Sequence, residues 1–237
     1  RAQRRRMLDA LKKLNQDQAS RFNDPAIATR IAQYELAFRM QMSVPELIDT
    51  KSEPKSVLEM YGPDATKPGK YAYNCLIARR LAERGVRFIQ LYHRGWDHHG
   101  GVKNGVLNTA KHVDKASAAL IRDLKDRGML DDTLIHWTTE FGRMPSTQGS
   151  KGRDHNPYVF TNWLCGGGIR GGVIAGESDE WGYKPIDRAH PTQVYDIHAT
   201  MLHLLGINHE RFSMKFQGLD MRLTGVEPAR VVKEILT

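Results

Sequence analysis

The chain has 237 residues, of which 40% are hydrophobic and 26% are charged, and its formal net charge is +8. This composition is typical of a globular protein that forms one α/β domain or two small domains. No apolar stretch approaches the roughly 20 residues that span a bilayer, so we expect no membrane helix and no membrane partner. Basic residues are interspersed with acidic ones outside the opening RAQRRR, which argues against nucleic-acid binding and leaves an anionic small substrate as an alternative.

The first residues, RAQRRRMLDALKK, contain neither an initiator Met nor an apolar signal segment. We therefore expect the chain to be a fragment or a processed product, in which this N-terminus carries no information on compartment. The two cysteines, Cys75 and Cys165, are too few for a disulfide framework, and we expect free thiols.

A helical arm and a linker are predicted over residues 1–55, and the main domain over 56–237. Residues 1–43 indicate two charged helices, and Asn23-Asp24-Pro25 supplies a cap and a start signal for the second helix. The following stretch, SVPELIDTKSEPKS, contains two prolines and is typical of a connection.

From Tyr71 onward the pattern predicts a β-α-β unit. YAYNCLIARRLAERG indicates a helix that ends at Gly85, VRFIQLYH a strand, residues 105–127 a second helix, and DTLIHWTT a second strand. Because such crossovers join parallel strands, we expect an α/β fold with a mostly parallel sheet flanked by helices. Further helices are predicted over roughly 191–207 and in VEPARVVKEIL near the end.

Two polar loops follow the two predicted strands, GWDHHGG after the first and EFGR after the second. Ligands bind beyond the carboxyl ends of parallel strands, so both loops are expected on one rim of the sheet. The polar candidates on this rim are Asp97, His98, His99, Glu140, Asp154 and His155. Carboxylate oxygen combined with imidazole nitrogen suits zinc or manganese, whereas oxygen alone would suit magnesium or calcium. The alternative is an ordinary polar turn, because D-x-H often arises by chance.

Two arginines, Arg143 and Arg153, flank the candidate ligands. An arginine beside a metal can bind a tetrahedral oxyanion such as phosphate or sulfate. A surface ion pair is the alternative that we weigh equally. Three other histidines, His136, His198 and His203, lie in apolar stretches and are assigned to core or capping roles.

Six motifs carry a resemblance to a known family: GWDHHGG, TEFGRMP, GRDHNP, WLCGGGIRGG, DIHATMLHLLGI and FQGLDMRLTGV. In this order they resemble the DUF1501 family over essentially the whole chain. Members are often labelled sulfatases and are placed in the alkaline-phosphatase-like superfamily. The resemblance implies an alkaline-phosphatase-like α/β fold, incomplete at the N-terminal side, with residues 56–237 as its C-terminal part. It also implies an exported, periplasmic or secreted protein.

The resemblance also implies roles for single residues. Asp97 and His99 are similar to the first ligand pair of the superfamily, Glu140 stands at the second carboxylate, and His155 resembles the final histidine. Phe141 departs from the pattern, because the superfamily has a histidine there and one nitrogen ligand is lost. The superfamily nucleophile, a Ser, Thr or formylglycine residue, belongs to an N-terminal half and is expected outside this chain.

The resulting hypothesis is a sulfatase-like, metal-dependent hydrolase of sulfate or phosphate esters, of which this chain is a fragment that lacks the nucleophile. A divalent metal, whether zinc, manganese, calcium or magnesium, would be held by Asp97, His99, Glu140 and His155. Arg143 and Arg153 would contact an anionic ester, such as a sulfated polysaccharide. The alternative is a non-catalytic protein that retains the fold and uses the rim for binding or assembly, which the departure at Phe141 and the missing nucleophile favour.

Overall fold

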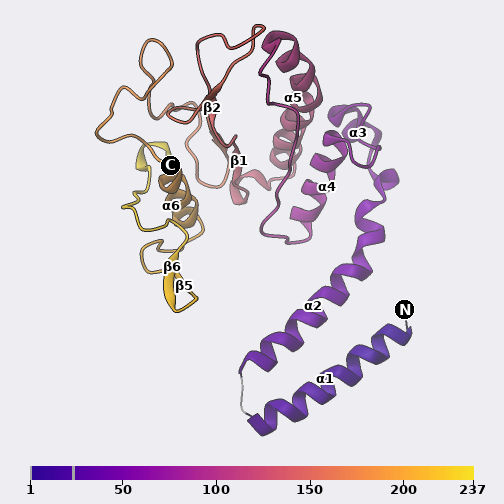
Figure 1. Cartoon of the computed structure of the whole chain (residues 1–237). Helices are drawn as coiled ribbons and strands as arrows, with labels where there is room; N and C mark the ends of the chain where they lie inside the picture. Colours follow the sequence, from indigo (N-terminus) through magenta and orange to yellow (C-terminus); the bar gives the residue numbers. More distant parts are fainter. Residues whose placement is uncertain (1, 23–24) are drawn as a thin grey trace.

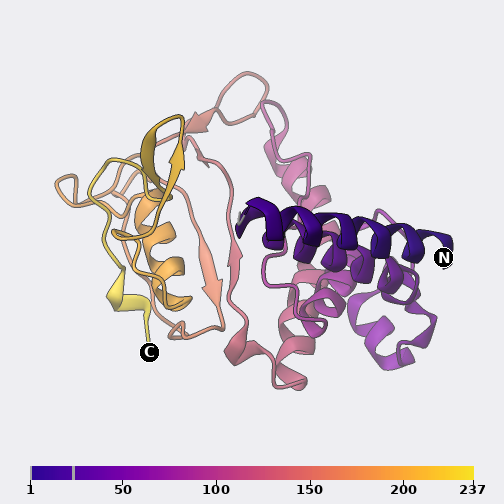
Figure 2. The same ribbon diagram turned by 90° about the horizontal axis from the view of Figure 1, so that it is seen from below.

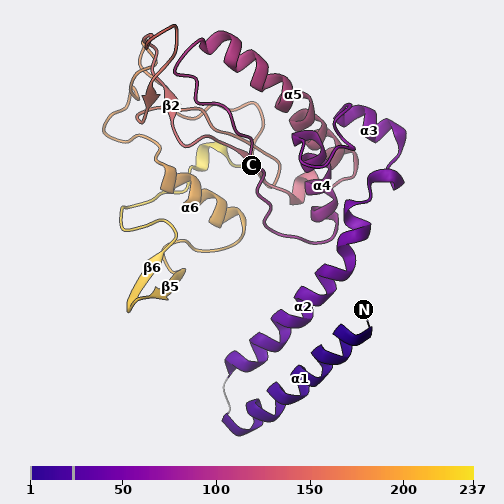
Figure 3. The ribbon, with the colours of Figure 1, turned by 45° about the vertical axis from the view of Figure 1, so that its right-hand side comes forward.

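The computed structural model describes residues 2–22 and 25–237. Two long helices, α1 (Ala2–Phe22) and α2 (Pro25–Ile48), lie side by side and project from the rest of the molecule (Figure 1, Figure 3). Arg5 of α1 donates a hydrogen bond of 2.7 Å to Glu35 of α2, which ties the pair together. The cap predicted at Asn23 and Asp24 lies outside the described residues.

The main core lies where α3 (Lys55–Tyr61), α4 (Tyr71–Glu83) and α5 (Val102–Asp126) meet. Its buried residues are Tyr61, Ala65, Ala72, Cys75, Leu76, Ala116 and Ala119. The helices predicted over 71–85 and 105–127 are confirmed, although α5 begins three residues earlier than its pattern indicates. Both cysteines are free, as predicted, and burial raises the pKa of the Cys75 thiol to about 12.

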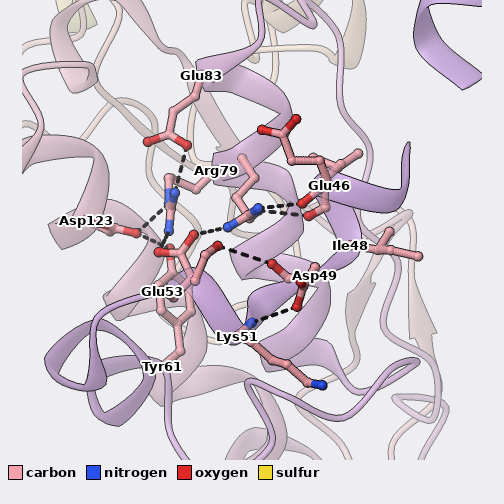
Figure 4. A network of polar contacts seen from close by, with 12 residues as sticks. Glu46, Ile48, Asp49, Lys51, Glu53, Tyr61, Arg79, Glu83 and Asp123 are labelled. Carbon is pink, nitrogen blue, oxygen red and sulfur yellow. Dashed lines mark hydrogen bonds and ion pairs between the residues drawn. The ribbon is translucent and has the colours of Figure 1, made fainter. Parts of the chain in front are cut away.

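A buried arginine joins three elements of this helical body (Figure 4). Arg79 of α4 is 2% exposed, and its guanidinium donates to Asp123 at 2.8 Å, to Glu83 at 2.7 Å and to Glu53 at 2.5 Å. Asp123 belongs to α5, and Glu53 follows the short 3-10 helix η1 (Thr50–Ser52). The network therefore fixes the linker against α4 and α5.

The neighbouring Arg80 anchors the end of α2. It donates to the main-chain oxygens of Leu47 and Glu46 at 2.8 and 2.7 Å, and also to the Glu53 carboxylate. Carbonyl groups in the last turn of a helix lack hydrogen-bond donors within the helix, and the Arg80 guanidinium provides donors for two of them. The anchored turn explains why α2 continues through Pro45 to Ile48, where the sequence predicts a connection from residue 43.

The strands form separate antiparallel pairs, so the predicted alkaline-phosphatase-like α/β fold, with a mostly parallel sheet flanked by helices, is wrong. The pairs are β1 (Ile135–Trp137) with β4 (Trp163–Cys165), β2 (Gly142–Arg143) with β3 (His155–Asn156), and β5 (Ser213–Phe216) with β6 (Leu219–Arg222). β1 follows the 3-10 helix η2 (Leu130–Asp132) and lies within the second predicted strand.

The segment over 86–93 accounts for this difference. It carries the first predicted strand, but within the described residues it pairs with no other strand, and Phe88 and Tyr92 are 79% and 80% exposed. A strand needs a neighbour to satisfy its N–H and C=O groups, and an apolar run by itself does not specify one. β1 instead pairs with the later strand β4, which runs in the opposite direction.

The C-terminal part packs around α6 (Val194–Leu204), which confirms the helix predicted over 191–207. The Thr200 hydroxyl accepts a hydrogen bond of 2.9 Å from the backbone N–H of Val232, so the final segment lies against α6. The helix predicted at the end is reduced to the 3-10 turn η3 (Lys233–Ile235). α6 lies on the opposite side of β1 and β4 from α4 and α5 (Figure 2).

In the described ranges, no helix combines the length and apolarity needed to cross a membrane.

Candidate metal centre

The candidate site is built from the loop before α5, the turn over 148–153, and strand β3, which follows the turn and carries His155. The N–H groups of Gly101 and Val102 donate to the carbonyls of Ser150 and Lys151 at 2.9 and 3.0 Å. Lys151 also forms an isolated β-bridge with Gly100. These main-chain bonds fasten the turn to the end of the 94–101 loop and bring side chains distant in sequence together.

Three of the four predicted ligands converge at this junction. Oδ1 of Asp97 lies 2.9 Å from Nε2 of His99 and 2.8 Å from Nε2 of His155, and the two nitrogens are 3.1 Å apart. One ligand atom from each residue lies within 4.8 Å of the other two. The side chains are between 41 and 64% exposed, so the group is open to solvent.

The fourth predicted ligand, Glu140, is exposed and does not belong to this group. His98 points elsewhere, with its Nε2 3.3 Å from the Thr109 hydroxyl on α5. Asp154, the remaining polar candidate, accepts the backbone N–H of His155 at 2.8 Å. The two short patterns D-x-H and R-D-H therefore each contribute to the group, whereas the EFGR segment contributes no carboxylate.

Arg143 supplies positive charge to the group. Its Nη2 donates to Asp97 Oδ1 at 2.9 Å and to the main-chain oxygen of Trp96 at 3.0 Å. Hydrogen bonds from His155 and Arg143 lower the pKa of Asp97 to about 2, so this carboxylate is ionised at neutral pH. Arg153 faces the turn instead, where it donates to the Thr147 hydroxyl at 3.3 Å.

Two further residues contact the imidazoles. The Phe141 ring, which the sequence marks only as the absence of a ligand, stacks on the His155 ring with centroids 3.9 Å apart. Gln148 places Oε1 2.7 Å from Nδ1 of His99. The glycines at 149 and 152 predict a turn from sequence. The contact between Gln148 and His99 spans about 50 residues, so no local sequence pattern predicts it.

The donor set fits a divalent transition metal. Two imidazole nitrogens and one carboxylate oxygen are ligands that zinc and manganese accept, whereas magnesium and calcium prefer oxygen. Three protein ligands also leave coordination positions for a substrate, as in catalytic zinc sites.

The sequence was compared with known families and proteins. The family model of DUF1501, described as a protein of unknown function, matches residues 1–236. A search of curated proteins and a search of solved structures found no match. Because the family model spans nearly the whole chain, the protein belongs to the DUF1501 family.

Proposed function

We propose that Asp97, His99 and His155 bind a divalent transition metal, and that this centre takes part in the hydrolysis of sulfate or phosphate esters with a nucleophile supplied from outside this chain. The observation that carries the proposal is the convergence of two imidazole nitrogens and one carboxylate oxygen within 4.8 Å, on a face open to solvent. In the reaction, water adds across the sulfur–oxygen or phosphorus–oxygen ester bond and yields an alcohol and free sulfate or phosphate.

The metal would polarise an ester oxygen and offset the negative charge that develops during hydrolysis. Two residues of the chain would support this chemistry. Arg143 holds the Asp97 carboxylate and places a cation beside the position of an anionic ester. Phe141 covers one face of the His155 ring. The net charge of +8 also suits an anionic substrate, such as a sulfated polysaccharide.

A non-catalytic binding or assembly role is the second candidate. It is favoured by the contacts of Asp97 Oδ1, which has three nitrogens within 2.9 Å, from Arg143, His99 and His155. A carboxylate paired in this way can stabilise the junction of the two loops without any further ligand. The two candidates differ in whether the group takes part in ester hydrolysis.

Equilibrium dialysis of the protein against Zn²⁺, Mn²⁺, Mg²⁺ and Ca²⁺ tests metal binding directly. We expect Zn²⁺ or Mn²⁺ to bind most tightly. Residues that only support a ligand typically contribute about 10- to 100-fold to affinity, so His99→Ala and His155→Ala should each cost more than that. His98→Gln is the matched control, because His98 is adjacent in sequence but contacts α5.

Hydrolysis of an aryl sulfate and an aryl phosphate, measured in the same variants, separates the two candidate functions. Ester hydrolysis that requires both metal and His155 supports the hydrolase. Tight metal binding without hydrolysis of either ester supports the binding or assembly role. A protein that binds none of the four ions, with His99→Ala equal to the parent in every assay, contradicts the metal site itself.

A further inference from the structure

We propose that Gln148 is a positioning residue that selects the tautomer of His99. Its amide oxygen accepts the Nδ1 proton of His99, which leaves Nε2 unprotonated and facing Asp97 and His155. This inference rests on the proposed metal site, because Nε2 is the atom that would bind the ion. An uncharged side chain would thus keep the ligand nitrogen of His99 free of a proton.

The first step of the argument is the geometry around the ring. Gln148 Oε1 is 2.7 Å from Nδ1, whereas Nε2 lies 2.9 Å from Asp97 Oδ1. A neutral imidazole carries one N–H, and the hydrogen bond made by one nitrogen decides whether the other can act as a ligand. An amide oxygen at Nδ1 therefore requires the proton there and frees Nε2.

The second step concerns the competing arrangement, in which His99 Nε2 carries the proton and donates it to Asp97. Oδ1 of Asp97 accepts a hydrogen bond from Arg143 at 2.9 Å, and Nε2 of His155 lies 2.8 Å from the same oxygen. Because the charged guanidinium of Arg143 already donates to this oxygen, we infer that the carboxylate competes less strongly than the Gln148 amide for the single proton of a neutral His99 ring.

The third step is the rigidity of the turn that carries Gln148. Its backbone N–H donates to the Gly152 carbonyl at 3.0 Å, and the Gly152 N–H returns a bond of 2.8 Å to the Gln148 carbonyl. The same turn is fastened to the His99 loop, since the Arg153 N–H donates to the His98 carbonyl at 3.1 Å. The amide is thus presented from a fixed backbone, as partners that orient metal-binding histidines generally are.

The test begins with the tautomer of His99 in metal-free protein. Long-range ¹H–¹⁵N spectra of uniformly labelled protein at about pH 9, well above the usual imidazole pKa of about 6.5, report which nitrogen holds the proton. The His99→Gln variant assigns the signals. We expect the Nδ1–H form in the parent, a shift toward Nε2–H in Gln148→Leu, and retention of Nδ1–H in Gln148→Glu, which keeps an acceptor.

Zinc affinity, measured by competition with a chromophoric chelator, provides the second readout. We expect Gln148→Leu to bind Zn²⁺ about 10- to 100-fold more weakly and Gln148→Glu to restore most of the affinity. Thr147→Val is the matched control, because Thr147 lies in the same segment but contacts Arg153 and not His99. Circular dichroism verifies that each variant is folded.

The outcomes separate this inference from the proposed function. An Nε2–H tautomer in the parent, or an unchanged tautomer in Gln148→Leu, overturns the role of Gln148 whether or not metal binds. The expected tautomers in a protein that binds none of the four ions support the positioning role and refute the metal site. If Thr147→Val weakens Zn²⁺ binding as much as Gln148→Leu does, the effect belongs to the turn and the inference is overturned.

Discussion

A guanidinium in the core must exchange its water for partners, because the cost of burying an unpaired charge is several kcal/mol. Arg79 meets this requirement with carboxylates from the linker, α4 and α5. The hydroxyl of Tyr61 adds a donor to Asp123 at 3.0 Å, and burial raises the pKa of that hydroxyl well above its ordinary value. Each charge in this cluster therefore depends on its neighbours.

Replacement of Arg79 should be among the most costly single substitutions in the chain. Arg79→Leu removes a cation from Asp123 and Glu53, whose side chains are only 4% and 6% exposed. The substitution should lower the free energy of unfolding by about 3–5 kcal/mol. Urea unfolding at neutral pH measures the change. In the control Arg122→Leu, a 75% exposed side chain loses only a 3.7 Å contact with Asp126, and the change should stay within about 0.5 kcal/mol. Equal losses in both variants would contradict the role of burial.

The candidate ligands show what could be predicted for single residues. Asp97 and His99 share one short loop, and their proximity follows from local sequence. The sequence places Glu140 beside them through a parallel sheet and through the family resemblance, but the strands form antiparallel pairs and Glu140 lies outside the group. The contacts of Phe141 and Gln148 depend on how distant loops meet, which no local pattern specifies. The metal-binding role of the group stays a prediction.

At the scale of elements, the turn over 148–153 depends on a glycine that admits no side chain. A Cβ atom at Gly152 would lie 2.0 Å from the main-chain oxygen of His99 and 2.6 Å from the nitrogen of Gly100. The obstacle is backbone and cannot rotate aside. The close approach of turn and loop, and with it the arrangement of His99, therefore requires glycine at this position.

Gly152→Ala should separate the turn from the loop. We expect a loss of about 1–3 kcal/mol in the free energy of unfolding, as for other overpacked sites, together with weaker Zn²⁺ binding. Thermal unfolding and chelator competition measure the two effects. Gly171→Ala is the matched control, because a Cβ atom there meets nothing within 4 Å. If the two variants behaved alike, the close packing at Gly152 would not matter to the site.

The elements differ in how far the sequence specifies them. α4 and α5 are predictable because their apolar spacing and their terminal glycines at 85 and 128 are local signals. Strand pairing is not local. The apolar run over 86–93 favours an extended backbone, but only a partner strand would make it part of a sheet. The predicted parallel pair is therefore wrong, although β1 is present within the second predicted strand.

At the scale of the whole molecule, the α1–α2 pair meets the body mainly where α2 ends (Figure 1). Apolar side chains along the pair, such as Leu14 and Leu36, are exposed, so its packing buries little surface. The body instead has a contiguous core between α3, α4 and α5. Stability is therefore unevenly distributed along the chain, with its weakest long helices at the N-terminal side.

Hydrogen exchange should reveal this gradient. Amides in α1 and in the first turns of α2 should exchange faster than those in α4 and α5, because opening the pair exposes little additional apolar surface. Arg80→Met should extend fast exchange to the last turn of α2, since it removes the donors to the Glu46 and Leu47 carbonyls. Arg84→Met is the matched control, because Arg84 donates to the exposed carboxylate of Glu46 and to the Arg80 carbonyl of α4, both at 3.1 Å, and neither acceptor is a main-chain group of α2. Exchange in the last turn of α2 should be unchanged in this variant. Equal protection of α1 and α5 would mean that another surface covers the α1–α2 pair. Equal effects of Arg80→Met and Arg84→Met would mean that the main-chain contacts of Arg80 do not anchor the end of α2.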